Sequence, residues 1–446
     1  MSDTSLNILD DLVQRAKAMG ADAADAVAVD ATSKGVSWRE GKLEDVEGSE
    51  GSDIGLRVFF GQKQAMTSTS DRSADSLQSL VERTVEMARN VPEDEYCGLA
   101  DADKLFHGPD QDLDLFDDTE VSADQLAELA AKAEDAARAV KGVTNSDGAG
   151  ASAGSWAIAL VTSHGFSGHY KGSSFSASIS AVAGEGTGME RDYDFTSARH
   201  FSDLEDASLI GRTAGEKAVK RLGAQQIKSG QMPIIFDPRV ANGLIGHLTG
   251  AIAGSAIARG TSFLMDQLGE RICSDSITIV DDPFMKRGLK SRQFDGEGVC
   301  VAPVNLVDRG ILKTWTLNSA TAKQLGLETT GHASRGTSSP PGIGLSNVYM
   351  AAGDQSVQNL MADIEDGFYV TELIGMGVNG VTGDYSRGAA GFKIEKGEIT
   401  TAVNEVTIAG NLKEMFKSMT PADDLSFKYG VNAPTIRIDG MMVAGA

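Results

Sequence analysis

The stretch 243-GLIGHLTGAIAGSAIARGTSFL-264 is the main helix-like segment in the C-terminal half of this 446-residue chain. Its apolar residues recur at helical spacing, and it follows a strand-like segment, 232-MPIIFDP-238. Beyond residue 264 glycine is frequent and helical periodicity is rare, with one short helix expected around 318–325. We therefore predict a mostly β C-terminal domain, barrel- or sandwich-like, that contains one glycine-rich helix.

The N-terminal half mixes helical and strand-like patterns. Apolar residues at helical spacing predict helices over 4–19, 73–90, 122–140 and about 203–222. Capping boxes are expected at two of the helix starts, Ser122/Gln125 and Ser202/Glu205. Hairpin turns are expected at Lys34-Gly35, Glu40-Gly41 and Gly61-Gln62, and a β-meander over 155–195. The whole chain is thus predicted to be α+β, with an N-terminal mixed α/β region of antiparallel sheet and helices.

Shifts in composition divide the chain into three expected domains. The first, 1–120, ends in an acidic and irregular connection over 93–120. The second, 121–228, holds the meander and two of the helices. The linker-like segment 224-AQQIKSGQMP-233 leads into the third and β-rich domain, 229–446.

Charge and hydropathy exclude several classes of partner. The chain carries 40 Lys and Arg against 63 Asp and Glu, a formal net charge of −23. Because phosphate and anionic-lipid surfaces are bound by clustered cations, this balance argues against a nucleic-acid or membrane-surface protein. No run of about twenty apolar residues is present, so no membrane span is expected.

The cysteines indicate a reducing compartment. Cys97, Cys273 and Cys300 are odd in number and have no CxxC spacing, which does not fit a disulfide framework. The N-terminus lacks a basic region followed by an apolar run, so no signal peptide is expected. We therefore expect a cytoplasmic protein.

Histidines offer one candidate metal pair. No histidine is followed by glutamate, so the HExxH motif of zinc peptidases is absent. His164 and His169 flank a predicted hairpin tip, 165-GFSG-168. This pattern fits a metal-binding pair, and it also fits two exposed turn residues.

Two glycine motifs occur outside the context that their usual chemistry requires. Gly150–Gly154 matches the GxSxG elbow of serine hydrolases, but a helix precedes it and a strand follows, the reverse of the required order. Gly375–Gly380 matches GxGxxG, but further glycines follow where a dinucleotide-binding helix would begin. A glycine-rich strand can instead allow another backbone to approach closely.

Several long motifs occur in a specific order along the C-terminal half: 277-ITIVDDPF-284, 294-FDGEGV-299, 310-GILKTWTLNSATAKQLGL-327, 330-TGHASRG-336, 370-VTELIGMGVNGVTGDYSRGAAGF-392 and 407-TIAGNLKEMF-416. With the stretch at 243–264, they resemble the TldD/PmbA family of bacterial peptidases, in particular its PmbA (TldE) branch. The resemblance covers nearly the whole chain and is strongest over about 240–420.

The resemblance implies a function. The family is described as a cytoplasmic zinc metallopeptidase assembled from two related chains, TldD and TldE. It acts on flexible or unfolded peptides, including peptide-antibiotic precursors and antitoxins. Its catalytic chain carries HExxxH on a helix ahead of an Arg-Gly-Thr-Ser element, and a later cysteine completes the zinc site. The PmbA branch is also described as a modulator of DNA gyrase.

The family's catalytic residues do not carry over to this chain. Counting back from Gly260-Thr261-Ser262, the first metal histidine falls on Ile245, the glutamate base on Gly246 and the second histidine on Gly250. His247 falls between the ligand positions, and no cysteine follows Cys300. Isoleucine and glycine cannot bind zinc or activate water. We therefore expect no catalytic residue and no metal in this chain, and we expect zinc in a TldD-type partner.

Three glycines recur where the metal helix would be. Gly246, Gly250 and Gly254 are spaced by four residues, which places them on one face of a helix, at a cost of about 2–3 kcal/mol against alanine. Either a partner element packs on this smooth face, or the face packs inside its own β-rich domain.

The leading hypothesis is a non-catalytic TldE-type subunit that forms a heterodimer with a TldD-type chain and forms half of a channel for unfolded peptide. Candidate peptide-contacting residues are Gly375, Gly377, Gly380, Gly383, Asp384, Tyr385 and Arg387. The same segment also fits a structural turn with an Arg–Asp pair. Two alternatives remain open: a non-enzymatic homodimeric binding or scaffold protein, which regulates gyrase or holds peptides, and an enzyme that uses His164 and His169.

Overall fold

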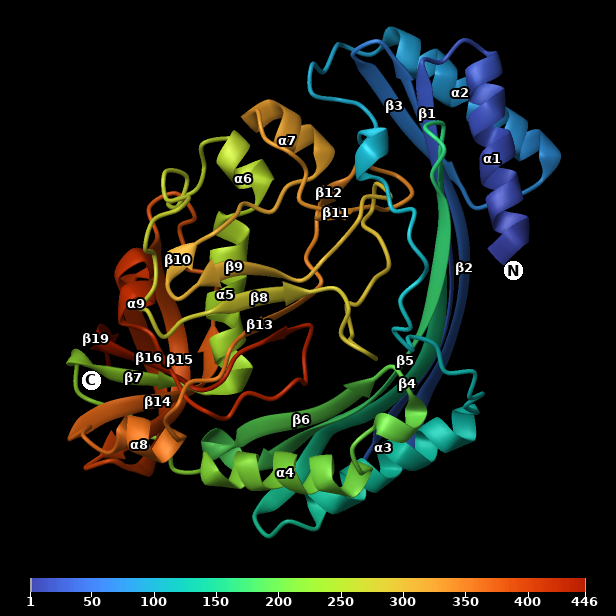
Figure 1. Cartoon of the computed structure of the whole chain (residues 1–446). Coiled ribbons are helices and arrows are strands. Elements are labelled where there is room, and N and C mark those ends of the chain that lie inside the picture. Colours follow the sequence, from blue (N-terminus) through green and yellow to red (C-terminus); the bar gives the residue numbers. More distant parts are fainter. Residues whose placement is uncertain (1, 446) are drawn as a thin grey trace.

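A long, curved, antiparallel sheet forms the N-terminal part of the structure, a computed structural model that describes residues 2–445 (Figure 1). Its strand order is β3-β2-β1-β4-β5-β6. The strands are β1 (Ala23–Arg39), β2 (Lys42–Phe60), β3 (Lys63–Thr69), β4 (Val143–Thr162), β5 (Ser167–Ala183) and β6 (Glu190–Ala198). Because β1 pairs with both β2 and β4, the ranges 1–120 and 121–228 share this sheet. The division of the chain at residue 120 stays a prediction.

Helices cover the two ends of this sheet (Figure 1). The helices are α1 (Ser2–Ala18) and α2 (Ala74–Asn90) at one end, and α3 (Ala123–Arg138) and α4 (Ala207–Lys220) at the other. Leu9 and Leu80 of the first pair pack in one apolar core with Leu56 of the sheet. Leu126 and Ile210 of the second pair belong to a separate core. The apolar stripes that predict these helices are therefore the faces buried on the sheet.

Three details of the N-terminal prediction have clear outcomes. The capping box at Ser122/Gln125 is confirmed. The capping box at Ser202/Glu205 is wrong, because α4 begins after Asp206, whose side chain accepts a hydrogen bond from the Ser208 N–H. The turn at Lys34-Gly35 is also wrong, because β1 continues through it and pairs with β2 and β4 on either side.

The C-terminal part contains a closed five-stranded barrel, as the β-rich pattern predicts. The strands follow the order β16-β15-β14-β7-β19, and β16 also pairs with β19 to close the ring. They are β7 (Gly230–Phe236), β14 (Asp366–Ile374), β15 (Asp384–Glu395), β16 (Glu398–Asn411) and β19 (Ile436–Ala444). β7 and β14 run parallel, and the other neighbours are antiparallel.

Short elements complete the C-terminal part. A second sheet has the order β10-β9-β8-β13-β18. Its strands are β8 (Ile279–Asp282), β9 (Val304–Asp308), β10 (Ile311–Leu312), β13 (Asn347–Met350) and β18 (Val431–Asn432). β11 (Ala333–Ser334) pairs with β12 (Gly342–Ile343), and β17 (Thr420–Pro421) pairs with β19. The short helices are α6 (Gly254–Ala258), α7 (Ser319–Leu325), α8 (Val357–Met361) and α9 (Leu412–Ser418). α7 confirms the helix expected around 318–325.

The glycine-rich helix α5 (Pro238–Ala251) lies in the core that the barrel shares with the second sheet. Asp237 caps its start by accepting a hydrogen bond from the Arg239 N–H, and proline occupies the first helical position. Leu244, Ile245 and Leu248 form its buried stripe. One face of α5 is thereby fixed in the core, and the opposite face is left toward the surface.

Buried ion pairs join the sheet to the C-terminal part. Arg57 of β2 and Arg335, which follows β11, both donate to the carboxylate of Asp25 on β1. Burial alone would raise the pKa of Asp25, but the two guanidinium groups outweigh it and lower that pKa to about 2. This carboxylate therefore holds strands β1 and β2 to the segment after β11.

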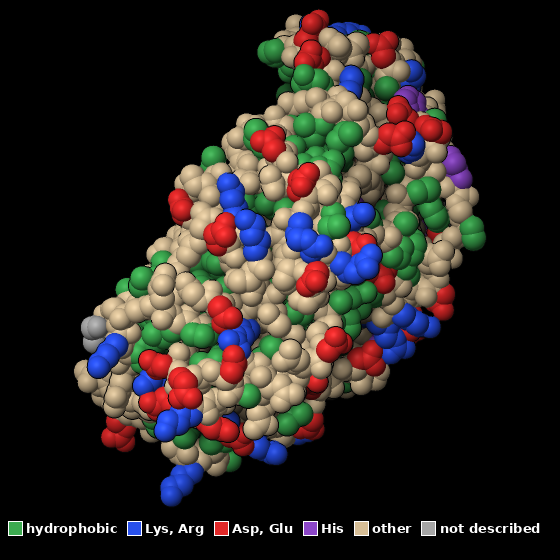
Figure 2. Space-filling model, turned by 60° about the vertical axis from the view of Figure 1, so that its left-hand side comes forward, with side chains coloured by type: hydrophobic (Ala, Val, Ile, Leu, Met, Phe, Trp, Pro, Cys, Tyr) green, Lys and Arg blue, Asp and Glu red, His purple; other side chains and the backbone are tan. Residues whose placement is uncertain are grey.

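Charges of both signs are interspersed on one face of the molecule (Figure 2). On the face in Figure 2, basic side chains stand singly or in small groups among acidic ones. Within residues 2–445, no helix is both long and apolar enough to cross a membrane.

Candidate functional site

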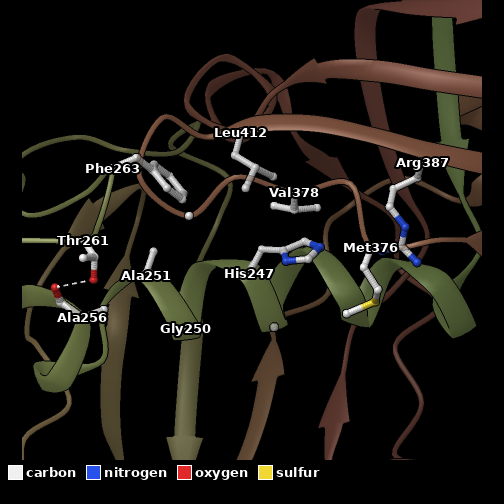
Figure 3. Close-up of a pocket in the computed structure, with 12 residues that line it drawn as sticks. His247, Gly250, Ala251, Ala256, Thr261, Phe263, Met376, Val378, Arg387 and Leu412 are labelled. Carbon is white, nitrogen blue, oxygen red and sulfur yellow. Dashed lines mark hydrogen bonds between the residues drawn. The ribbon is translucent and has the colours of Figure 1, made fainter.

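A pocket of about 280 Å³ lies against the surface-facing side of α5 (Figure 3). Its floor is formed by Gly246, His247 and Gly250 of that helix. The other lining residues come from the last residue of α5, the segment after it, the β14–β15 region and the start of α9: Ala251, Ala256, Thr261, Phe263, Met376, Val378, Gly380, Arg387 and Leu412. The structure therefore brings two of the three helix positions predicted to replace a metal motif, Gly246 and Gly250, and part of the glycine-rich 375–387 segment to one site.

The residues at the expected metal positions do not fit a zinc ion. Ile245 is 1% exposed and packs in the core, while Gly246 and Gly250 offer no side chain. His247 is the one imidazole that lines the pocket, and the charged group on the same lining is the cation of Arg387. In residues 2–445, no three His, Cys, Asp or Glu side chains are grouped so that they could hold a metal ion. A zinc peptidase mechanism has no donor set at this position.

The three glycines do not form one continuous packing face, so this part of the prediction is corrected. A Cβ on Gly246 or Gly250 would meet no atom within 4 Å, whereas one on Gly254 would lie 2.6 Å from Leu317 and 2.7 Å from Thr321. Gly254 belongs to α6, because α5 ends at Ala251. Gly254 therefore packs inside its own domain, and the other two face the pocket.

Two contacts from distant residues end α5. The Gly254 N–H donates to the carbonyl of Thr316 at 2.8 Å, which turns the chain out of the helix. The buried hydroxyl of Ser262 donates to the carbonyl of Ala251 at 2.6 Å and satisfies a group that the helix leaves free. In this chain the Arg-Gly-Thr-Ser element thus has a structural role at the end of α5.

His247 is half-buried and held by an aromatic contact. Its ring meets the ring of Tyr385 edge-to-face, with centroids 5.9 Å apart. Burial, and then the positive charge of Arg387, lower the pKa of His247 below its usual 6.5. The imidazole is therefore neutral near pH 7. Among residues 2–445 it has no hydrogen-bond partner, so its ring nitrogens are available to a ligand.

The loop between β14 and β15 covers the other side of the pocket. Gly375 and Gly383 have positive φ angles, 80° and 84°, which favour glycine. Gly377 lies against β15, where a Cβ would come 2.1 Å from the Ser386 carbonyl oxygen. At Gly377 the close backbone approach is therefore made by this chain's own strand. Met376 is 88% exposed and lines the rim of the pocket.

The three side chains of the predicted peptide-contacting set have different environments. Asp384 is engaged in the turn, where it accepts hydrogen bonds from Thr382 at 2.7 Å and Asn411 at 3.1 Å, which lower its pKa. Tyr385 is only 2% exposed. Arg387 lines the pocket, and its Nε donates to the Ile374 carbonyl at 3.4 Å. An Arg–Asp pair is not formed, because no carboxylate pairs with Arg387 in the part of the chain that the structure describes.

Sequence reasoning missed the apolar wall of the pocket. Phe263 follows α6, Val378 lies in the β14–β15 loop and Leu412 begins α9 (Figure 3). No spacing rule links these three residues, because only the fold brings them together. The other candidate pair, His164 and His169, is exposed around the β4–β5 turn and belongs to no metal-binding group among residues 2–445.

Comparison with known protein families identifies the family to which this chain belongs. Three family models match consecutive parts of it: PmbA/TldA metallopeptidase domain 1 over residues 24–88, the central domain over 116–222 and the C-terminal domain over 229–445. These models span the curved sheet and the barrel, so the chain is a member of a metallopeptidase family. The chain belongs to the PmbA/TldD family, as its sequence motifs predict.

Relatives and solved structures agree with this assignment. Metalloprotease PmbA of Escherichia coli O157:H7 is 37% identical over 95% of this chain and 92% of its own length. The Metalloprotease PmbA homolog of Haemophilus influenzae is 36% identical over 92% of this chain and 89% of its own. A Bacteroides thetaiotaomicron protein, described as a candidate modulator of DNA gyrase, superposes with a TM-score of 0.92 at 26% identity, covering 100% of this chain and 99% of that one. TldE from Thermococcus kodakarensis shares the fold, with a TM-score of 0.88, 23% identity and coverage of 98% and 100%.

Proposed function

We propose that this chain is a non-catalytic TldE-type subunit of a two-chain zinc metallopeptidase and that the pocket on α5 helps to hold an extended peptide. Zinc and the catalytic groups are supplied by a TldD-type partner in the cytoplasm. The substrates are unfolded or flexible peptides, such as peptide-antibiotic precursors and antitoxins. This chain forms part of the wall of the peptide channel.

The observation that carries the proposal is the pocket on α5, which lies at the helix positions where the family resemblance places a metal site. Ile245 is turned into the core, and Gly246 and Gly250 leave open space where ligating side chains would stand. A site without donors cannot activate water through a metal, but a pocket with exposed backbone and apolar walls can hold a peptide. The relatives named metalloproteases and the shared fold of TldE support this role.

The test combines purification and cleavage. The chain is purified alone and together with a TldD-type chain, and cleavage of an unfolded peptide is measured with and without a zinc chelator. We expect no cleavage by the isolated chain and chelator-sensitive cleavage by the pair. The matched control is a TldD-type chain whose HExxxH glutamate is replaced by glutamine, and it should be inactive in the same complex.

A second function is favoured by one comparison, the structural neighbour described as a candidate modulator of DNA gyrase. It would make the chain a homodimeric binding or scaffold protein. Failure to bind any TldD-type chain, with a stable homodimer in solution, would favour that function. Robust chelator-sensitive cleavage by the isolated chain would overturn the proposal of a non-catalytic subunit.

A further inference from the structure

We infer that the pocket on α5 is a subsite for the C-terminal residue of a peptide that ends in an apolar amino acid, with the terminal carboxylate on Arg387. The inference rests on the proposed peptide-binding function and names the part of the peptide that is recognised. Four features of the pocket carry it: its size, its apolar wall, its unpaired cation and its open side.

The size of the pocket suits a single residue. Its volume of about 280 Å³ lies just below the range of about 300–1,000 Å³ that is typical of small-molecule sites. Phe263, Val378 and Leu412 supply apolar surface on one side, while Gly246 and Gly250 leave the helix side flat. Figure 3 shows these apolar side chains opposite the helix, with His247 between them. An apolar side chain inserted here would lose its contact with water on both sides.

The charge of the pocket suits a carboxylate. Arg387 has no carboxylate partner within residues 2–445, although the chain has a net charge of −23, and Asp384 is held by Thr382 and Asn411. The guanidinium lies beside Met376 and His247 at the end of the pocket (Figure 3). A guanidinium presents a planar fork of N–H donors that matches the two oxygens of a carboxylate. Neutral His247 adds a second possible donor on the same side without a second charge.

The single cation beside an apolar wall also indicates which kind of anion the pocket binds: it favours a carboxylate over a phosphate. A phosphate carries about two charges near pH 7 and is usually bound by several cations or by backbone N–H groups at a helix start. In this pocket the helix contributes middle and C-terminal residues, and Arg387 is the one cation on the lining. A monoanion with an adjoining apolar side chain fits these groups, and the last residue of a peptide has that chemistry.

The pocket opens on a wider hollow that can take the preceding residues. This hollow has a volume of about 560 Å³ and shares Met376, Val378 and Gly380 with the pocket. Its remaining lining includes Asn379 and Ser386 from the loop and from β15. An extended chain could therefore run along the β14–β15 loop and end at Arg387.

The test measures binding to the isolated full-length chain by fluorescence anisotropy. Two labelled unfolded peptides have the same sequence ending in leucine, one with a free carboxylate and one with a terminal amide. We expect the acid to bind at least about tenfold more tightly, because a hydrogen bond between two charged groups is stronger than one to a neutral amide. Arg387→Gln should remove this preference. Gly250→Leu, which fills the pocket, should weaken both peptides.

Arg259→Gln is the matched control, because Arg259 is an exposed arginine near the pocket without an ion pair in residues 2–445. It should keep the preference for the acid. If Arg387→Gln does not fold, Arg387→Lys replaces it and should reduce the preference. Equal binding of acid and amide by the unaltered chain, or binding unaffected by Gly250→Leu, would overturn the inference. Loss of cleavage by the complex with this preference intact would instead overturn the proposed function alone.

Discussion

The glycines of α5 allow the pocket to be tested through stability. Gly246 lies in the interior of α5, where glycine costs about 1 kcal/mol relative to alanine. A Cβ at this position would meet no atom within 4 Å, so Gly246→Ala should recover that cost. We expect the free energy of unfolding of the C-terminal part to rise by about 1 kcal/mol. Gly250 lies next to the end of the helix, so Gly250→Ala should raise it by only about 0.5 kcal/mol.

Gly254 gives the opposite expectation and serves as the control. Its Cβ would lie 2.6 Å from Leu317 and 2.7 Å from Thr321, closer than carbon and oxygen atoms can pack. Overpacking of this kind costs about 1–3 kcal/mol, so Gly254→Ala should destabilise the protein. The expected change in the free energy of unfolding on replacing glycine by alanine is therefore positive in α5 and negative in α6.

Urea unfolding monitored by tryptophan fluorescence can measure these differences. Trp315 belongs to the core that contains α5, whereas Trp38 and Trp156 lie on the N-terminal sheet. In a background with Trp38→Phe and Trp156→Phe, the remaining fluorescence reports on the C-terminal core. A loss of stability in Gly246→Ala, or no loss in Gly254→Ala, would refute the assignment of the open and packed faces.

Two further predictions concern buried polar groups. Asp25→Asn should lower the free energy of unfolding by about 3–5 kcal/mol at pH 7, because it leaves Arg57 and Arg335 buried without a carboxylate. Folding lowers the pKa of Asp25 from 3.8 to about 2, so its ionised carboxylate contributes fully to the free energy of unfolding above pH 4, and this contribution is lost as the pH falls toward 2. Denaturant titrations at several pH values measure the difference in the free energy of unfolding between the original protein and Asp25→Asn. This difference should become smaller between pH 4 and pH 2 and should stay constant above pH 4. Tyr385→Phe should raise the free energy of unfolding by about 1 kcal/mol in the same assay, because the Tyr385 hydroxyl is buried without a hydrogen-bond partner among residues 2–445; a fall would show that a bound water or ligand satisfies it.

Much of the fold follows from local patterns in the sequence. The apolar residues of α1 to α4 predict these helices because the residues that each helix buries recur at helical spacing within one short segment of the sequence. The end of α5 could not be predicted in this way, because it depends on the contact of Gly254 with Thr316, which lies far along the chain. Closure of the barrel likewise depends on the pairing of β16 with β19, which no local pattern indicates.

Only part of the candidate site can be read from sequence order. The register from Thr261-Ser262 predicts that Gly246 and Gly250 replace ligating residues, and this depends on sequence order alone. The apolar wall around Phe263 and the position of Arg387 at the pocket depend on tertiary structure. The sequence also cannot show that the side chain of Asp384, a predicted peptide contact, accepts hydrogen bonds from Thr382 and Asn411 in its own turn.

The zinc content of the isolated chain tests the central claim most directly. The tag-free chain is dialysed against buffer that contains zinc in slight excess, and the bound zinc is measured by inductively coupled plasma mass spectrometry. Because Ile245, Gly246 and Gly250 provide no donor, we expect far less than one zinc ion per chain, and we expect the same zinc content in His247→Gln. One tightly held zinc ion per chain, lost in His247→Gln, would contradict it.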